Sequence, residues 1–159
     1  MAAPKEDWQQ ESARVLAQAR VVVVKVGSAV LTDANGLSVP VLENLAGQLA
    51  RLRTLLPDGA ASDVASDVAS GAKPRRLVLV SSGAVAAGRA ALSSRGLVVE
   101  TTGLAARQAA AAVGQGQLMQ AWDKVFLAHR MPTAQVLLTR DDLRARQRFL
   151  NARNTFAEL

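Results

Sequence analysis

The stretch VVVVKVGSAVLT, residues 21–32, combines a run of valines with a lysine and a glycine where a buried strand would end. An ammonium group in an apolar strand costs on the order of several kcal/mol unless it reaches water or meets an anion. Lys25 and Gly27 lie on the same side of a strand, and Gly27 with Ser28 is expected to turn the backbone so that N–H groups are exposed. A cation beside free amides suits phosphate. The alternative is a lysine that simply extends from the strand end into solvent.

A second candidate is SSGA, residues 81–84, which directly follows the apolar run RRLVLV. Ser81 or Ser82 is expected to cap a helix that begins near Gly83. Helix N-termini attract anions through unpaired N–H groups and the positive end of the helix dipole. Plain helix capping is the alternative. If the strands before KVGS and SSGA are neighbours, two anion sites face each other.

Other residues that could bind ligands or take part in catalysis have structural explanations. The chain contains neither a P-loop pattern nor G-x-G-x-x-G, and GQG at residues 114–116 lies inside a helical stretch rather than after a strand. His129 is the only histidine, so a histidine-rich metal site is excluded and a position on a helix face is expected. Asp141 and Asp142 follow a strand pattern, yet they also suit the first turn of a helix, where carboxylates favour the dipole.

The elements that must position these residues alternate between strand and helix patterns. Strand patterns occupy residues 21–26, 75–80 and 132–139, and helix patterns occupy 8–19, 38–56, the stretch after Gly83, 104–129 and 141–159. Ser38 can cap the second helix, after a polar turn TDANGLS. Gly114 and Gly116 interrupt the 104–129 stretch, which is therefore either two helices or one with a kink. This alternation predicts a parallel sheet with right-handed crossovers and with ligands at the carboxyl ends of its strands.

Composition favours one α/β domain. The 159 residues are 50% hydrophobic but only 3% aromatic, so the core must consist of Val, Leu and Ala. Cysteine is absent, which excludes disulfides and fits a reducing compartment, and we expect a cytoplasmic location. No apolar run approaches the roughly 20 residues that span a bilayer, so no membrane association is expected.

Charge and complexity are unevenly distributed. The formal net charge is +6, and arginines recur at 140, 144, 146, 148 and 153. Such a run could bind nucleic acid phosphates or an acidic partner. No aromatic residues interleave to stack bases, so a solvated helix face is the favoured interpretation. Residues 57–74 repeat SDVA in tandem and predict a low-complexity surface loop.

Four segments occur in the same order and at similar spacing as in a known family: VVVVKVGSAVLT, LVLVSSGAVAAGRAAL, ARQAAAAVGQGQLMQAWDKVF and VLLTRDDLRARQRFLNARNT. From Arg20 onward, apart from the SDVASDVA loop, the chain resembles the amino acid kinase family, and within it the members that phosphorylate L-glutamate. The resemblance implies a three-layer α/β/α sandwich with a mainly parallel sheet, incomplete in this chain, rather than a P-loop domain.

The resemblance also implies a reaction and its residues. ATP, carried with Mg2+, would phosphorylate the γ-carboxylate of L-glutamate on the route to proline. Lys25 would contact the nucleotide phosphates and stabilise charge on the transferring group, with Gly27 and Ser28 as further phosphate donors. The segment Ser82, Gly83 and Ala84 would bind glutamate, with the Gly83 amide close to the reacting carboxylate. A homo-oligomer, proline as a feedback inhibitor and no metal site on this chain are further implications.

The family's chain continues past the position of Leu159, through Asn-Glu-Asn-Asp and Asp-Asn-Asp segments, a nucleotide-binding region and a second lysine, none of which occurs here. We therefore expect residues 1–19 to form an N-terminal extension or helix, and residues 20–159 the N-terminal, substrate-side part of a kinase domain that is inactive alone. Two alternatives stay open. The chain is a non-catalytic fragment that binds substrate weakly or only supports oligomerisation, or it belongs to a relative with a different acceptor.

Overall fold

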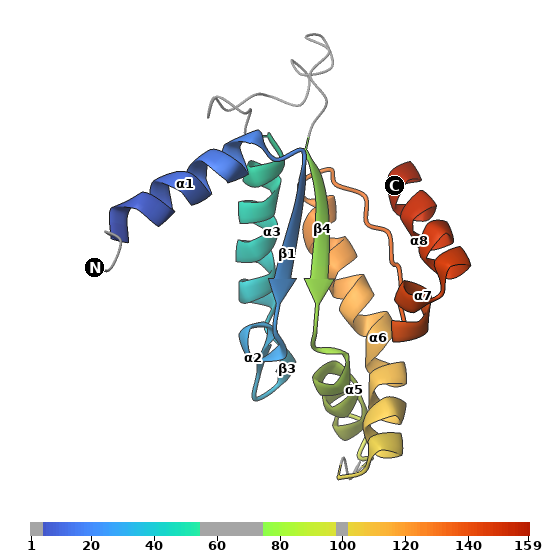
Figure 1. Cartoon of the computed structure of the whole chain (residues 1–159). Helices are drawn as coiled ribbons and strands as arrows, with labels where there is room; N and C mark the ends of the chain where they lie inside the picture. Colours follow the sequence, from blue (N-terminus) through green and yellow to red (C-terminus); the bar gives the residue numbers. More distant parts are fainter. Residues whose placement is uncertain (1–4, 55–74, 98–101) are drawn as a thin grey trace.

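A computed structural model describes residues 5–54, 75–97 and 102–159, and the predicted SDVA loop lies outside them. The elements are α1 (Lys5–Gln18), β1 (Val21–Val26), α2 (Ser28–Leu31), β2 (Thr32–Asp33), β3 (Gly36–Leu37), α3 (Val39–Thr54), β4 (Arg76–Ser81), α5 (Ala84–Ser93), α6 (Leu104–Leu127), α7 (Arg140–Arg144) and α8 (Arg146–Glu158). The predicted α/β class is confirmed, with a small sheet and helices packed against it (Figure 1).

The sheet at the centre consists of β1 and β4, which run parallel in register from Val21 opposite Arg76 to Val26 opposite Ser81. The valine-rich and leucine-rich runs predicted the two strands, and the alternation of strand and helix patterns predicted their parallel direction. The turn expected from TDANGLS contains a second, antiparallel pair, β2 with β3, and the short helix α2 precedes it. This hairpin follows β1 through the single turn of α2 and borders the same end of the sheet.

Helices α3 and α6 pack on one face of the sheet and form the core with it. Alternation along β1 buries Val22 and Val26 and leaves Val21 and Val23 exposed, as expected when one face of a sheet is covered. The buried cluster comprises Val26, Leu31, Leu42, Ala46, Leu49, Leu118, Trp122, Val125 and Phe126. Leu42, Ala46 and Leu49 therefore mark the core face of α3. Ser38 precedes α3, and its carbonyl accepts the Leu42 N–H at 3.1 Å.

Helix α6 is one continuous helix of 24 residues and crosses α5 at two glycines. A Cβ at Gly114 would lie 2.8 Å from the Cα of Gly88 and would also overlap the Ala84 carbonyl oxygen. A Cβ at Gly88 would in turn overlap the backbone of Ala110. Gly114 therefore allows the two helix backbones to touch, which confirms the structural interpretation of GQG.

Helix α1 lies where the sequence predicted it, but its apolar face is not covered. Trp8, Val15 and Leu16 are all exposed. The contact near its end is polar: the buried guanidinium of Arg75 donates to the Ala17 carbonyl at 2.6 Å and to the Leu52 carbonyl at 3.4 Å. Arg75 therefore joins the last turns of α1 and α3, where a cation also favours the dipoles.

Two elements predicted near the C-terminus differ from those in the structure. Residues 132–139 form no regular element and join neither sheet in the described part of the chain, so the predicted third strand is wrong. Their apolar pattern favours extended backbone, but a strand also needs a neighbour for its N–H and C=O groups. The predicted helix 141–159 is two helices, because Ala145 adopts an extended ψ of 117° between α7 and α8. Alanine is the best helix former, so its residue type does not mark this break.

Candidate functional site

The carboxyl ends of β1 and β4 lie side by side, so KVGS and SSGA meet at one end of the sheet (Figure 1). Ser81 is in register with Val26, and the Ser82 N–H donates to the Val26 carbonyl at 3.1 Å. The two segments that the sequence singled out separately are thus direct neighbours.

Lys25 lies on the sheet face opposite α3 and α6 and is exposed. Its neighbour in register, Val80, is also on the exposed face, and no carboxylate pairs with Lys25 in the described ranges. The lysine therefore pays no burial penalty in the valine run. Its ammonium group is free to meet an anion without first breaking an ion pair.

Gly27 has φ −78° and ψ 158°, which is extended backbone that any residue adopts, so the expectation that glycine is needed here for a turn is wrong. A Cβ at this position would meet nothing within 4 Å. The absent side chain instead leaves open space beside the backbone, through which a bulky anion could approach. Ser28 begins α2 and is exposed, so its hydroxyl is accessible on the same side of the turn.

Gly83, rather than a serine, is the N-cap residue of α5. Its φ of +115° lies in the region that favours glycine, and no side chain caps the helix. The prediction that Ser81 or Ser82 caps it is therefore wrong. The Gly83 carbonyl accepts the Ala87 N–H at 2.9 Å, whereas the Gly83 N–H has no acceptor within the described residues. Ser82 is exposed beside it, and Ala84 begins the helix.

The β2–β3 hairpin packs beside Gly83, the N-cap residue of α5. A Cβ on Gly83 would lie 3.4 Å from Leu37 Cδ2 and 3.9 Å from Thr32 Cγ2. The β2–β3 hairpin that follows KVGS thus packs against the SSGA turn. No sequence pattern predicts this contact, because the hairpin strands have only two residues each.

A further residue at this end of the sheet also escaped the sequence patterns. The Trp122 indole N–H donates to Ser81 Oγ at 2.9 Å, although the two residues are 41 positions apart. Trp122 is buried and stacks on Phe126 with ring centroids 5.5 Å apart. The sequence placed Trp122 only within the helix pattern at residues 104–129.

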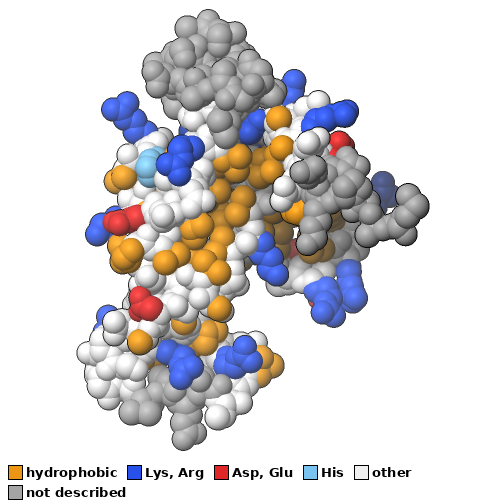
Figure 2. All heavy atoms as spheres, turned by 90° about the vertical axis from the view of Figure 1, so that its left-hand side faces the viewer, with side chains coloured by type: hydrophobic (Ala, Val, Ile, Leu, Met, Phe, Trp, Pro, Cys, Tyr) orange, Lys and Arg blue, Asp and Glu red, His pale blue; other side chains and the backbone are white. Residues whose placement is uncertain are grey.

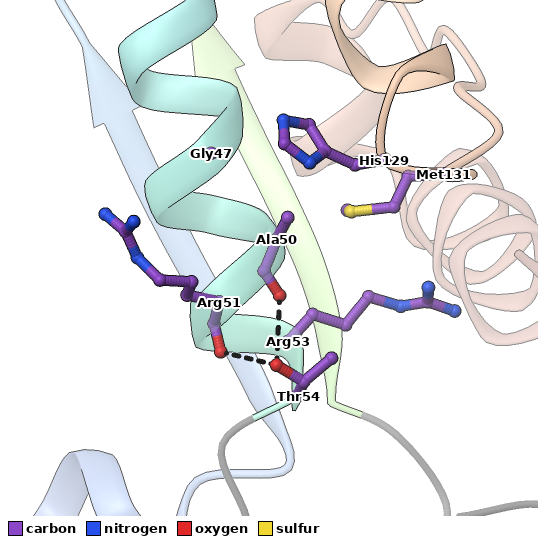
Figure 3. A pocket seen from close by; sticks show the side chains of 7 residues that line it. All are labelled: Gly47, Ala50, Arg51, Arg53, Thr54, His129 and Met131. Carbon is purple, nitrogen blue, oxygen red and sulfur yellow. Dashed lines mark hydrogen bonds between the residues drawn. The ribbon is translucent and has the colours of Figure 1, made fainter. Parts of the chain in front are cut away.

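A cavity of about 290 Å3 lies elsewhere, between the last turns of α3 and the turn after α6 (Figure 3). Its lining residues are Gly47, Ala50, Arg51, Arg53, Thr54, His129 and Met131. None of the predicted site residues lines it. His129 lies just beyond the end of α6 rather than on the helix itself, a small correction to the expected helix-face position.

The arginine run lies on α7 and α8 and is exposed, as a solvated face requires. Arg148 approaches Asp142 at 3.9 Å, and Asp142 forms a capping box with Thr139. Hydrogen bonds from the Thr139 hydroxyl and backbone N–H lower the pKa of Asp142 below its ordinary value of 3.8. This confirms the structural interpretation of Asp142 as a residue of the first helical turn.

The described residues contain no group of three or more His, Cys, Asp or Glu side chains that could hold a metal ion. Within the same residues, no helix is both long and apolar enough to cross a membrane.

Comparison with known proteins defines the class. The model of the amino acid kinase family matches residues 20–159, and the chain belongs to this family. Among its relatives is the glutamate 5-kinase of Oleidesulfovibrio alaskensis, 52% identical over 153 residues, which are 96% of this chain and 35% of the relative. The glutamate 5-kinase of Nitratidesulfovibrio vulgaris is 50% identical over the same shares. That of Maridesulfovibrio salexigens is 45% identical over 92% of this chain and 33% of its own length. The chain thus spans about a third of the curated relatives that it matches.

Proposed function

We propose that this chain is the substrate-side part of a glutamate 5-kinase. The complete enzyme transfers the γ-phosphoryl group of ATP to the γ-carboxylate of L-glutamate, yielding ADP and γ-glutamyl phosphate for proline biosynthesis. The similarity to three glutamate 5-kinases carries this proposal. The meeting of KVGS and SSGA at one end of the sheet supports it, because phosphoryl transfer depends on holding two anionic reactants close together.

In this proposal the β1 end binds the nucleotide phosphates. The exposed, unpaired Lys25 supplies positive charge to the transferring group, and open space at Gly27 lets a phosphate approach the backbone beside Ser28. A lysine ammonium beside the transferring phosphoryl group stabilises the negative charge of the transition state.

The β4 end binds the acceptor. The Ser82 hydroxyl and the Gly83 N–H, which has no acceptor among the described residues, would bind the glutamate carboxylate at the N-terminus of α5, next to Ala84. The dipole of this ten-residue helix favours negative charge there. The two reactants therefore lie at neighbouring strand ends.

Mg2+ has no donor set within the described residues, so it would arrive with ATP rather than bind this chain directly. In this proposal the described residues of this chain do not coordinate Mg2+ directly. Proline feedback, a homo-oligomer and a cytoplasmic location stay predictions.

We also infer the three-layer α/β/α sandwich for the complete domain. Val21, Val23 and Val80 are 47%, 63% and 46% exposed on the sheet face that α3 and α6 leave open. A second helical layer over these side chains would bury a surface that water covers here.

The test uses a chimera in which this chain replaces the matching stretch of the O. alaskensis relative, with the unmodified 159-residue chain assayed alongside. With ATP, Mg2+ and L-glutamate, the acyl phosphate is trapped as a hydroxamate. We expect turnover by the chimera and none by the chain alone. Lys25→Ala should lower kcat on the order of 100-fold, whereas Lys124→Ala, a matched exposed lysine on α6, should not.

A folded chimera without glutamate-dependent turnover would contradict the proposal. Product from L-aspartate or carbamate in place of L-glutamate would instead identify a different acceptor within the same family. Turnover by the chain alone would contradict the expectation that this part is inactive by itself.

A further inference from the structure

We propose that Trp122 and Ser81 are positioning residues that aim the Gly83 N–H at the acceptor carboxylate through a two-step hydrogen-bond relay. This proposal rests on the proposed function for the identity of the acceptor. The relay runs from the Trp122 indole N–H to Ser81 Oγ at 2.9 Å, and from the Ser81 hydroxyl to the Ser82 carbonyl at 3.1 Å.

The direction of each bond follows from the donor chemistry. An indole N–H can only donate, so Ser81 Oγ must accept from Trp122. The Ser81 proton is then left to donate, and the Ser82 carbonyl is the acceptor that the geometry provides. Trp122 thus determines the orientation of the Ser81 hydroxyl, which would otherwise rotate freely.

The second bond fixes a peptide plane. The Ser82 carbonyl and the Gly83 N–H belong to one planar trans peptide unit, in which the two groups point in opposite directions. Holding the carbonyl toward Ser81 therefore turns the Gly83 N–H away from Ser81 and fixes where it points. Gly83, with its positive φ, lacks the side-chain restraint that would otherwise limit rotation of this peptide.

Trp122 is a rigid starting point for the relay. It is 3% exposed, and the ring of Phe126 stacks on it with an interplanar angle of 24°. A buried indole N–H without an acceptor would lose its hydrogen bond to water, so the contact with Ser81 is strongly favoured. The core of the protein thereby sets the geometry of the turn, in which Ser82 is exposed and Gly83 is buried.

The first arm of the test uses NMR on the 159-residue chain, which contains two tryptophans. In Ser81→Ala we expect the Trp122 indole signal to shift and its proton to exchange faster, while the signal of exposed Trp8 is unchanged. Both Ser81→Ala and Trp122→Phe should shift the Gly83 amide signal. The control is Ser94→Ala, which removes a hydroxyl bonded to Ala91 at the far end of α5.

The second arm measures kinetics in the chimera. Ser81→Ala and Trp122→Phe should each raise the KM for L-glutamate about 3- to 10-fold, with the KM for ATP unchanged. The double variant should be no worse than either single variant, because both break one relay. Ser81→Thr keeps the hydroxyl, so its KM for L-glutamate should equal that of the unmodified chimera.

The outcomes separate the relay from a merely structural role and from the proposed function. The relay would be overturned if the Gly83 amide signal did not shift in Ser81→Ala and Trp122→Phe, or if the KM for ATP rose as much as the KM for L-glutamate. Additive effects of the two changes, accompanied only by a lower Tm, would also overturn it. No turnover by the unmodified chimera would contradict the proposed function, while the NMR arm would still decide whether Trp122 and Ser81 orient the Gly83 peptide.

Discussion

Asp142 and Thr139 illustrate how a short helix is stabilised by two side chains. The Asp142 N–H donates to Thr139 Oγ1 at 3.3 Å, and the Asp142 carboxylate accepts from the Thr139 N–H at 2.7 Å. The first contact satisfies a helix N–H that has no partner within the helix, and the second is stronger when the carboxylate is ionised. The start of α7 therefore depends in part on the charge of one half-buried residue, Asp142.

We predict that this cap weakens in acid. The Thr139 hydrogen bonds lower the pKa of Asp142 in the folded protein. Its contribution to stability is thus present above the unfolded pKa, about 3.9, and is lost as pH falls through the lower folded value. NMR titration of the Asp142 carboxyl should show a midpoint below 3.8 that rises in Thr139→Val. Arg148→Gln should raise the titration midpoint of Asp142 less than Thr139→Val does. Equal shifts in the two variants would contradict the larger role of Thr139.

At the scale of residues, the candidate site residues could be predicted from the sequence, whereas their hydrogen-bond partners could not. Lys25 and Gly83 were visible because a charge and a glycine interrupt apolar runs. The contact between Trp122 and Ser81 was not visible, because a tryptophan at helical spacing predicts burial but not the acceptor of its N–H. Capping by serine was also wrong, since Gly83 takes a positive φ that serine avoids.

At the scale of elements, the close crossing of α5 and α6 is the most constrained contact. Gly88 and Gly114 leave no room for a Cβ, and the obstructing atoms are backbone atoms rather than movable side chain ends. Gly116, two residues along the same helix, has open space in the corresponding position. The chain thus contains a constrained glycine and a matched unconstrained one.

We predict opposite effects of alanine at these two positions. Gly116→Ala should stabilise the chain by up to about 1 kcal/mol, because alanine is the better helix former. Gly114→Ala should destabilise it by about 1–3 kcal/mol, because α5 and α6 must separate. Urea unfolding followed by circular dichroism gives both values. Equal stability of the two variants would show that the helices do not cross this closely in solution.

Elements with strong periodicity were predictable, and those defined by pairing were not. Strands β1 and β4 and helix α3 follow from runs of valine and leucine. Residues 132–139 have a similar apolar pattern, yet no neighbouring strand accepts them within the described chain. Local sequence indicates a preference for extended backbone, whereas a sheet also depends on which edges are available.

At the scale of the whole molecule, apolar surface is exposed on one side of the sheet. Figure 2 shows hydrophobic side chains gathered in a band along the middle of one face. The sheet itself exposes Val21, Val23 and Val80. Apolar surface of this kind favours self-association when nothing covers it.

We predict that the 159-residue chain self-associates through the open sheet face. Val23→Lys should reduce association, because Val23 is exposed at the middle of β1 and a charge there is costly to bury. Val30→Lys, which adds the same charge on α2, should have little effect. Sedimentation velocity at several concentrations measures both. Association that is unchanged in Val23→Lys would place the contact elsewhere.

The parallel pairing of β1 with β4 also has a kinetic consequence. Val21 pairs with Arg76, 55 positions later, whereas Gly88 and Gly114 are only 26 positions apart. Contacts between distant positions require closure of a longer loop and slow folding. We therefore expect α5 and α6 to dock early and the two strands to pair late. The turn that carries Gly83 would then acquire its final geometry only in the last step of folding, when β4 meets β1.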